Sequence, residues 1–212
     1  MSNGLNSEKA LIFRITHIDN IPWILNNGLH CRNSPDSDSN FVNIGNLELI
    51  GKRHTKSIPI FPFGTLSDYV PFYFTPYSPM MFNIKTGYGV PKKNNRDIVI
   101  MVTSLRRIAE NGLKYVYTDR HAYLATASYY SSLDDLGVID WDNLQRRDFK
   151  RDPDDPEKVE KYQAEALIHK HLQIDSLMGL VCYNQQVKEK LDALVQAKGL
   201  DLDIHIRPKW YF

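Results

Sequence analysis

The sequence has few of the features that place a protein outside the cytoplasm. Its only cysteines, Cys31 and Cys182, lie far apart, and no Cys/His cluster has zinc-binding spacing. Its apolar runs, such as residues 98–102, are far shorter than the ~20 residues that cross a bilayer. Residues 1–9 carry no apolar stretch behind a basic start, as a secretory signal would. We therefore expect a cytoplasmic protein without a metal site or a membrane segment.

The sequence also lacks an excess of positive or negative charge. The 26 Lys and Arg residues nearly balance the 25 Asp and Glu residues, so a nucleic-acid site would have to come from local patches. The sequence has no Walker or Rossmann glycine loop, no Gly-x-Ser-x-Gly elbow and no His-Glu-x-x-His motif, which leaves kinases, serine hydrolases and zinc proteases without support. Aromatic residues are plentiful at 11%, and they must fill a core or bind flat ligands. The length of 212 residues predicts one domain over residues 1–212.

The hydrophobic pattern predicts short strands and helices without strict βα alternation, which favours an α+β fold. Residues 163–172 could form a helix or a strand, residues 31–48 predict a loop, and residues 146–160 predict a loop that becomes regular near residue 158. Strands are predicted at residues 11–17, 69–74, 98–102, 115–118, 177–183 and 203–207, and helices at residues 21–27, 46–56, 105–112 and 186–198.

Residues 13–29 place a strand directly before a helix. The strand carries Arg14 and Thr16 near its end, and Asp19 or Asn20 is a suitable N-cap for the helix. A guanidinium beside a helix N-terminus suits a phosphate group. A solvated arginine on a surface strand is the simpler interpretation of the spacing alone.

Three further motifs combine groups that can carry chemistry. Residues 52–56 contain four basic or potentially basic side chains, although such a run is usually a solvated face. Gln163 and Glu165 would project to one face of a strand, where an amide and a carboxylate can grip sugar hydroxyls or stabilise a cationic carbon. We expect Glu165 at the exposed rim of the core, where a structural salt bridge is the alternative role. Asp119 is either the cap of a helix that begins at Arg120 or part of a DNA contact.

Five segments in this order resemble the DarT family of DNA ADP-ribosyltransferase toxins. The resemblance covers the chain from about Phe13 to Phe212. It implies an ADP-ribosyltransferase-like split, bent two-sheet core with peripheral helices, and NAD in the cleft between the sheets. The segments are FRITHIDNIPWILNNGL from residue 13, YVPFYFTPYSPM from residue 69, VYTDRHA from residue 116, QAEALIHK from residue 163 and RPKWYF from residue 207.

The resemblance also implies roles for individual residues. Glu165 would stabilise the sugar cation that forms when nicotinamide leaves, and Arg53 would be the second catalytic residue. Tyr73 would stack on the nicotinamide ring, and Arg14 would face the pyrophosphate or adenosine. The full set of residues implied to bind NAD is Arg14, Thr16, His17, Asn20, Tyr73 and Gln163.

The acceptor implied by the resemblance is a base of single-stranded DNA, most often thymidine, which must be unstacked to expose the modified atom. The implied partners are single-stranded DNA and a macrodomain antitoxin, and the protein would act as a monomer. RNA, a guanine base or a protein side chain are alternative acceptors, and a non-catalytic nucleic-acid-binding module is a third alternative. The candidate DNA contacts are Arg120, His121, Arg146, Arg147, Lys150 and Arg151, followed by Lys92, Lys93 and Arg96.

Overall fold

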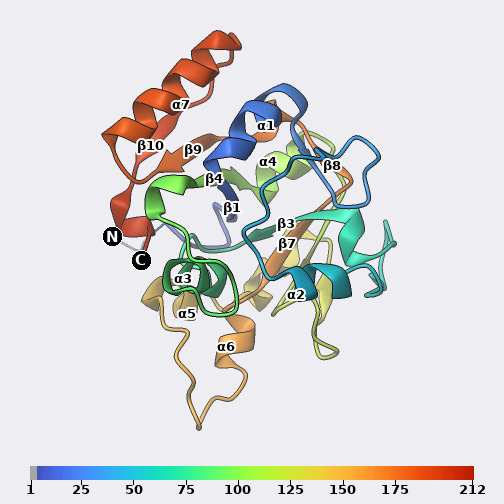
Figure 1. The fold of residues 1–212 in the computed structure, drawn as a ribbon. Helices are drawn as coiled ribbons and strands as arrows, with labels where there is room; N and C mark the ends of the chain where they lie inside the picture. Colours follow the sequence, from blue (N-terminus) through green and yellow to red (C-terminus); the bar gives the residue numbers. More distant parts are fainter. Residues whose placement is uncertain (1–3) are drawn as a thin grey trace.

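An eight-stranded sheet forms the centre of the computed structural model, which describes residues 4–212 (Figure 1). Its strand order is β10-β9-β4-β1-β3-β7-β5-β6, and β10 with β9 is its parallel pair. A second sheet pairs β2, Leu29–His30, with β8, His171–Leu172. The strands of the large sheet are β1 Leu11–His17, β3 Tyr69–Tyr73, β4 Ile98–Ser104, β5 Tyr115–Thr118, β6 Tyr129–Tyr130, β7 Glu165–His169, β9 Gly179–Cys182 and β10 Ile204–Ile206.

The large sheet is divided between β1 and β3. β1 is matched with β4 along its whole length, from Leu11 to His17, whereas it meets β3 at a single pair, Phe13 and Tyr73. Here the Arg14 guanidinium donates a hydrogen bond of 2.8 Å to the carbonyl oxygen of Pro71, so a side chain supplies the bond that a regular ladder would make. The expected split of the core therefore lies within the large sheet, which opens at this junction, and the α+β fold class is confirmed.

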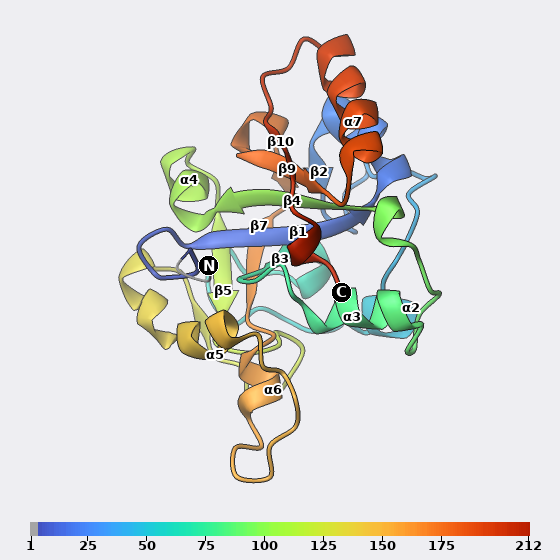
Figure 2. The same cartoon turned by 90° about the vertical axis from the view of Figure 1, so that its left-hand side faces the viewer.

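Short helices cover the sheet, and their caps explain their limits. The hydroxyl of Ser78 caps α3, Pro79 occupies its first position, and Gly87 ends it in a left-handed conformation with φ of 82°. Figures 1 and 2 place α7 at one end of the molecule and α6 at the opposite end. The helices are α1 Ile21–Asn27, α2 Leu47–Lys52, α3 Pro79–Thr86, α4 Leu105–Glu110, α5 Trp141–Arg146, α6 Lys158–Lys161 and α7 Gln185–Ala197.

The structure confirms each predicted strand and helix to within a few residues at its ends, apart from α2, which ends at Lys52. It also contains α3 and α5, which the hydrophobic pattern did not predict. No helix begins at Arg120, because Asp119 accepts hydrogen bonds from the Ser128 amide and the Arg120 guanidinium instead. Among residues 4–212, no helix is long and apolar enough to cross a membrane.

Candidate active site

A cleft of two adjoining lobes lies where the large sheet opens. The Glu165 lobe also contains Thr16, Tyr73 and His121, and the Trp23 lobe also contains Cys31. The cavity volume is about 140 Å³ in the Trp23 lobe and about 160 Å³ in the Glu165 lobe. The residues that line both lobes, and therefore mark their junction, are Arg14, Phe41, Asn43, Ile50, Arg53 and Pro71.

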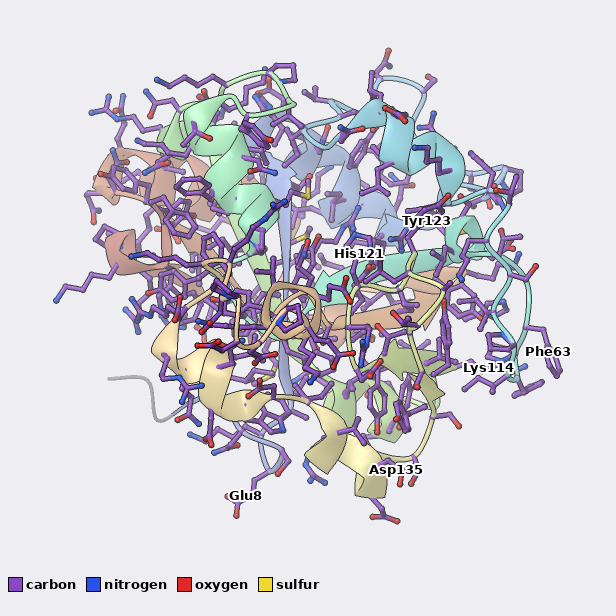
Figure 3. All side chains as sticks on the ribbon, turned by 90° about the horizontal axis from the view of Figure 1, so that it is seen from below. Glu8, Phe63, Lys114, His121, Tyr123 and Asp135 are labelled. Carbon is purple, nitrogen blue, oxygen red and sulfur yellow. The ribbon has the colours of Figure 1, made fainter. Side chains whose placement is uncertain are left out.

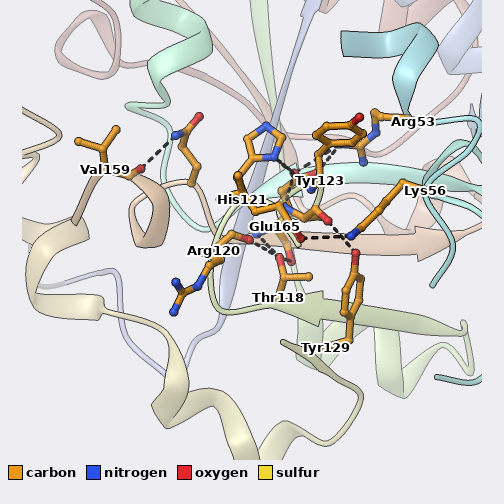
Figure 4. Close-up of polar contacts among 12 residues, drawn as sticks. Arg53, Lys56, Thr118, Arg120, His121, Tyr123, Tyr129, Val159 and Glu165 are labelled. Carbon is orange, nitrogen blue, oxygen red and sulfur yellow. Dashed lines mark hydrogen bonds and ion pairs between the residues drawn. The ribbon is translucent and has the colours of Figure 1, made fainter. Parts of the chain in front are cut away.

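Glu165 is the first residue of β7 and lies opposite Tyr73 of β3. Its side chain is only 2% exposed, so the expectation of an exposed rim carboxylate is wrong. The Arg53 guanidinium donates to both carboxylate oxygens, at 3.0 and 3.4 Å, and the Ala122 amide donates to Oε1 at 3.1 Å. His121 Nδ1 lies 3.6 Å from the same Oε1 (Figure 4). These partners let a charged group occupy a position that would otherwise exclude it.

The electrostatics of the cleft keep Glu165 ionised. Burial alone would raise the pKa of its carboxyl group. The charges of Arg53 and His121 and the hydrogen bond from Ala122 outweigh burial, so the pKa of Glu165 lies below its ordinary value. Burial, helped by Glu165, raises the pKa of Tyr73 and keeps its hydroxyl neutral. The cleft therefore offers a fixed negative charge beside a neutral aromatic ring.

Each of the two guanidinium groups in the cleft has one hydrogen-bond donor that is not used within residues 4–212. Arg14 Nε and Arg53 Nη2 are both buried, and neither has a hydrogen-bond partner among the described residues. Burial, followed by the nearby charge of Arg53, lowers the pKa of Arg14 to about 10, so Arg14 remains cationic at neutral pH. A buried donor without a partner costs free energy, and an anionic ligand between these residues would remove that cost.

The turn after β5 holds the remaining partners of Glu165 in place. The Thr118 hydroxyl accepts the Glu165 amide at 3.2 Å, and the Tyr129 hydroxyl donates to the Ala122 carbonyl at 2.7 Å. Lys56 donates to the Leu124 carbonyl at 3.2 Å and so connects the segment after Arg53 to the same turn (Figure 4). The basic run at residues 52–56 is therefore not a uniformly solvated face.

The structure separates the residues expected to bind NAD into two groups. Arg14, Thr16 and Tyr73 line the cleft. His17 instead accepts a hydrogen bond from the Asp19 amide. The Asn20 side chain bonds the Thr16 hydroxyl and both backbone groups of Val42, which ties the segment 31–46 to β1.

Gln163 is also placed away from the cleft lining. It lies before β7 begins and donates its amide to the Val159 carbonyl at 3.0 Å. The expectation that Gln163 and Glu165 share one face of a strand is therefore wrong, because only Glu165 belongs to the strand.

The candidate DNA contacts also differ in their availability. Arg120 is only 11% exposed and is paired with Asp119, Glu157 and Glu160, so its charge is already neutralised. Arg147 packs over the Tyr77 ring at 3.7 Å. His121 lines the cleft itself. The exposed candidates are Arg146, Arg147, Lys150, Arg151, Lys92 and Arg96, while Lys93 is partly exposed.

Sequence reasoning missed the residues that close the cleft from the segment before Arg53. Phe41, Asn43 and Ile50 line both lobes, although residues 31–46 form no regular helix or strand. The available signal was the group of apolar side chains Phe41, Val42 and Ile44 after a polar stretch, because an apolar residue in a loop needs a surface to cover.

Comparison with known proteins agrees with this geometry. Residues 13–212 match the family model described as ssDNA thymidine ADP-ribosyltransferase, DarT. A DNA ADP-ribosyl transferase of Escherichia coli O127:H6 is 52% identical over 212 residues, which are 100% of this chain and 97% of that protein. A DNA ADP-ribosyl transferase of Thermus sp. strain 2.9 is 33% identical, with 97% of each chain covered.

Solved structures of the Thermus sp. 2.9 protein have the same fold. Its DarT in complex with ADP-ribosylated ssDNA gives a TM-score of 0.88 at 31% identity and covers 97% of both chains. Its complex with NAD⁺ gives a TM-score of 0.84 at 31% identity, with 97% of this chain and 98% of that chain covered. The chain described here belongs to the DarT family of ssDNA thymidine ADP-ribosyltransferases.

Proposed function

We propose that this chain transfers ADP-ribose from NAD to a thymidine base in single-stranded DNA and releases nicotinamide. The observation that carries the proposal is the junction of the two lobes, where Arg14 and Arg53 bring unpartnered buried donors next to the ionised Glu165. The structure of NAD matches the two lobes and their junction, because a pyrophosphate joins its two nucleosides. The Thermus relative, whose structures contain NAD⁺ and ADP-ribosylated ssDNA, supports the same reaction.

The lobes suggest how NAD is held. The pyrophosphate lies at the junction and accepts hydrogen bonds from Arg14 Nε and Arg53 Nη2, which have no other partners among the described residues. The nicotinamide nucleoside occupies the Glu165 lobe, where Tyr73 offers a ring for stacking. The adenosine occupies the Trp23 lobe.

Glu165 acts on the bond between ribose and nicotinamide. When that bond breaks, nicotinamide leaves with the electron pair and the sugar carbon becomes cationic. The fixed carboxylate stabilises this charge more in the transition state than in the ground state, which is the condition for accelerating the reaction. A ring nitrogen of the base then bonds to the sugar carbon and gives up its proton to a basic group of the site. Arg53 keeps the carboxylate in position through its two hydrogen bonds.

The acceptor must enter as an unpaired base, because a paired base hides the reacting nitrogen. Arg146, Lys150 and Arg151 are exposed and precede β7 in the sequence, which makes them suitable contacts for the DNA phosphates. A monomeric state, a cytoplasmic location, the absence of a metal and a macrodomain antitoxin as partner remain predictions from the sequence.

Mass spectrometry of short single-stranded oligonucleotides after incubation with NAD tests the proposal. We expect one ADP-ribose on oligonucleotides that contain thymidine and an equal amount of free nicotinamide. Duplex DNA, RNA and thymidine-free oligonucleotides serve as controls and should stay unmodified. Labelling of RNA or of added protein in place of DNA would overturn the proposed acceptor.

A further inference from the structure

The turn at residues 57–65 holds two phenylalanine side chains in solvent. Phe61 is 61% exposed and Phe63 is 55% exposed, and their rings meet edge to face with centres 6.2 Å apart. This turn lies between α2, which is capped by Arg53, and β3, which carries Tyr73. Two neighbouring aromatic rings left exposed in one turn indicate a binding surface.

Hydrogen bonds fix this turn in one conformation. The Ile58 amide donates to the Gly64 carbonyl at 2.9 Å, and the Phe63 amide donates to the Ile60 carbonyl at 2.8 Å. The buried Tyr69 donates its hydroxyl to the Phe63 carbonyl at 2.6 Å. Phe63 has a left-handed backbone with φ of 62°, which is unfavourable for a bulky residue. The backbone of Phe63 therefore adopts an unfavourable conformation, and because its ring is exposed, no burial of apolar surface compensates for this cost.

One cationic side chain lies beside the turn, and the turn packs against the segment that follows His121. The Lys114 ammonium lies 4.9 Å from the centre of the Phe61 ring. Ile58 and Ile60 pack in one cluster with Ala122 and Tyr123, the residues that follow His121. Figure 3 shows Phe63 and Lys114 at the edge of the molecule, on the same side of His121 as Tyr123.

We propose that Phe61 and Phe63 form a stacking platform for DNA bases that flank the modified thymidine, and that Lys114 contacts a phosphate there. The inference rests on the proposed function, because it names a second contact region for the same substrate. Exposed rings beside a cation are the combination that binds single strands without reading their sequence, since every base has a face that can stack. The Lys114 ammonium beside the rings, and the packing of this turn against the residues that follow His121, favour DNA over a partner protein as the occupant.

The double variant Phe61→Ala/Phe63→Ala tests the platform. Its DNA substrates are oligonucleotides of about 4 to about 16 nucleotides, the range of site sizes in single-strand-binding folds. We expect the KM for the longest oligonucleotides to rise at least about tenfold, with kcat unchanged and with little effect on the shortest. Restoring aromatic rings with Phe61→Trp/Phe63→Trp should restore the KM. Met178→Ala serves as a matched control, because it removes a 45% exposed apolar side chain next to β9, in the other half of the sheet.

Lys114→Gln provides a second measurement that leaves both rings in place. Loss of one phosphate contact should reduce the slope of log Kd against log salt concentration by about 0.7 for a single strand. Unchanged KM values at every length, or an unchanged salt slope, would overturn the platform. Lost binding to a partner protein with DNA kinetics intact would reassign the surface. Failure of the proposed function would look different, because the unmodified protein would then label no oligonucleotide of any length.

Discussion

Asp68 and Glu165 lie at opposite ends of one antiparallel strand pair, because β3 begins directly after Asp68 and its last residue, Tyr73, is paired with Glu165. The Asp68 carboxylate accepts hydrogen bonds from the Thr65 amide and hydroxyl, from Asn33 and from Lys170. Burial would raise the pKa of Asp68, but these donors hold it well below its usual range.

The Glu165 end is built differently. Its carboxylate is more deeply buried than that of Asp68, at 2% against 15% exposure, and its main partner, Arg53, keeps a buried donor that has no partner in residues 4–212. Arg14, on β1 beside β3, has a second buried donor without a partner among the described residues. The Asp68 end of the strand pair therefore connects chain segments, while the Glu165 end keeps hydrogen-bond donors that a ligand can use. The comparison predicts that changes at the two ends will affect different properties of the protein.

The largest expected effect follows from Glu165→Gln. The amide oxygen can still accept from the Ala122 amide, but the charge that stabilises the sugar cation is lost. We expect the rate of DNA labelling to fall by about 10²- to 10³-fold, as for other losses of transition-state stabilisation. Single-turnover labelling followed by mass spectrometry measures this rate, and a thermal melt checks folding. A rate equal to that of the unmodified protein would remove Glu165 from the mechanism.

Asp68→Asn should produce the opposite result. The variant keeps the size of the side chain but weakens charge-assisted bonds to three chain segments, so the free energy of unfolding should fall by about 1–3 kcal/mol. Denaturant unfolding measures the loss, with Asp36→Asn in an exposed loop as the control. The labelling rate per folded molecule should stay close to that of the unmodified protein. A large loss of that rate with full stability would contradict the division between the two ends.

Arg14→Lys tests whether the unused donor of Arg14 contributes to NAD binding. Lysine keeps the positive charge but cannot bond the Pro71 carbonyl and a pyrophosphate together, because it lacks the fixed fork of a guanidinium. We expect the Kd for NAD to rise about tenfold, which is about 1.4 kcal/mol. Calorimetric titration with NAD in the absence of DNA measures this affinity. An unchanged Kd would show that Arg14 is only a structural bridge across the split in the sheet.

The smallest effect concerns pH. The pKa of Asp68 is lower in the folded chain than in the unfolded chain, so its contribution to stability is present above about pH 4 and is lost as the pH falls. The stability difference between the unmodified protein and Asp68→Asn should therefore shrink by about 1 kcal/mol over the pH unit below about 3.9. Urea unfolding at several pH values checks the sign, and a difference that grows at low pH would contradict it.

The sequence predicts the strands of this fold better than its short helices. Residues 11–17 and 98–104 carry apolar patterns that determine β1 and β4 locally, and α7 has a clear amphipathic period. Residues 79–86 form a helix longer than α1 and α4, but its amphipathic period is weak. Ser78 and Pro79 were nevertheless an available signal for α3, because a capping hydroxyl before a proline is typical of a helix start.

The site is only partly predictable because its contacts are distant in sequence. Arg53 meets Glu165 across 112 residues, and this contact makes burial of the carboxylate possible. Local pattern alone therefore indicated an exposed rim residue. Likewise, the period-of-two argument for Gln163 failed because β7 begins two residues later. The family resemblance supplied Glu165, Arg53, Arg14 and Tyr73, which all line the cleft.

A crystal structure of Glu165→Gln soaked with NAD would show where the dinucleotide binds, because this variant should hold the substrate without consuming it. We expect the pyrophosphate within hydrogen-bond distance of Arg14 Nε and Arg53 Nη2, with the nicotinamide nucleoside beside residue 165. Electron density for NAD outside the two lobes, with both guanidiniums still unpartnered, would contradict this expectation.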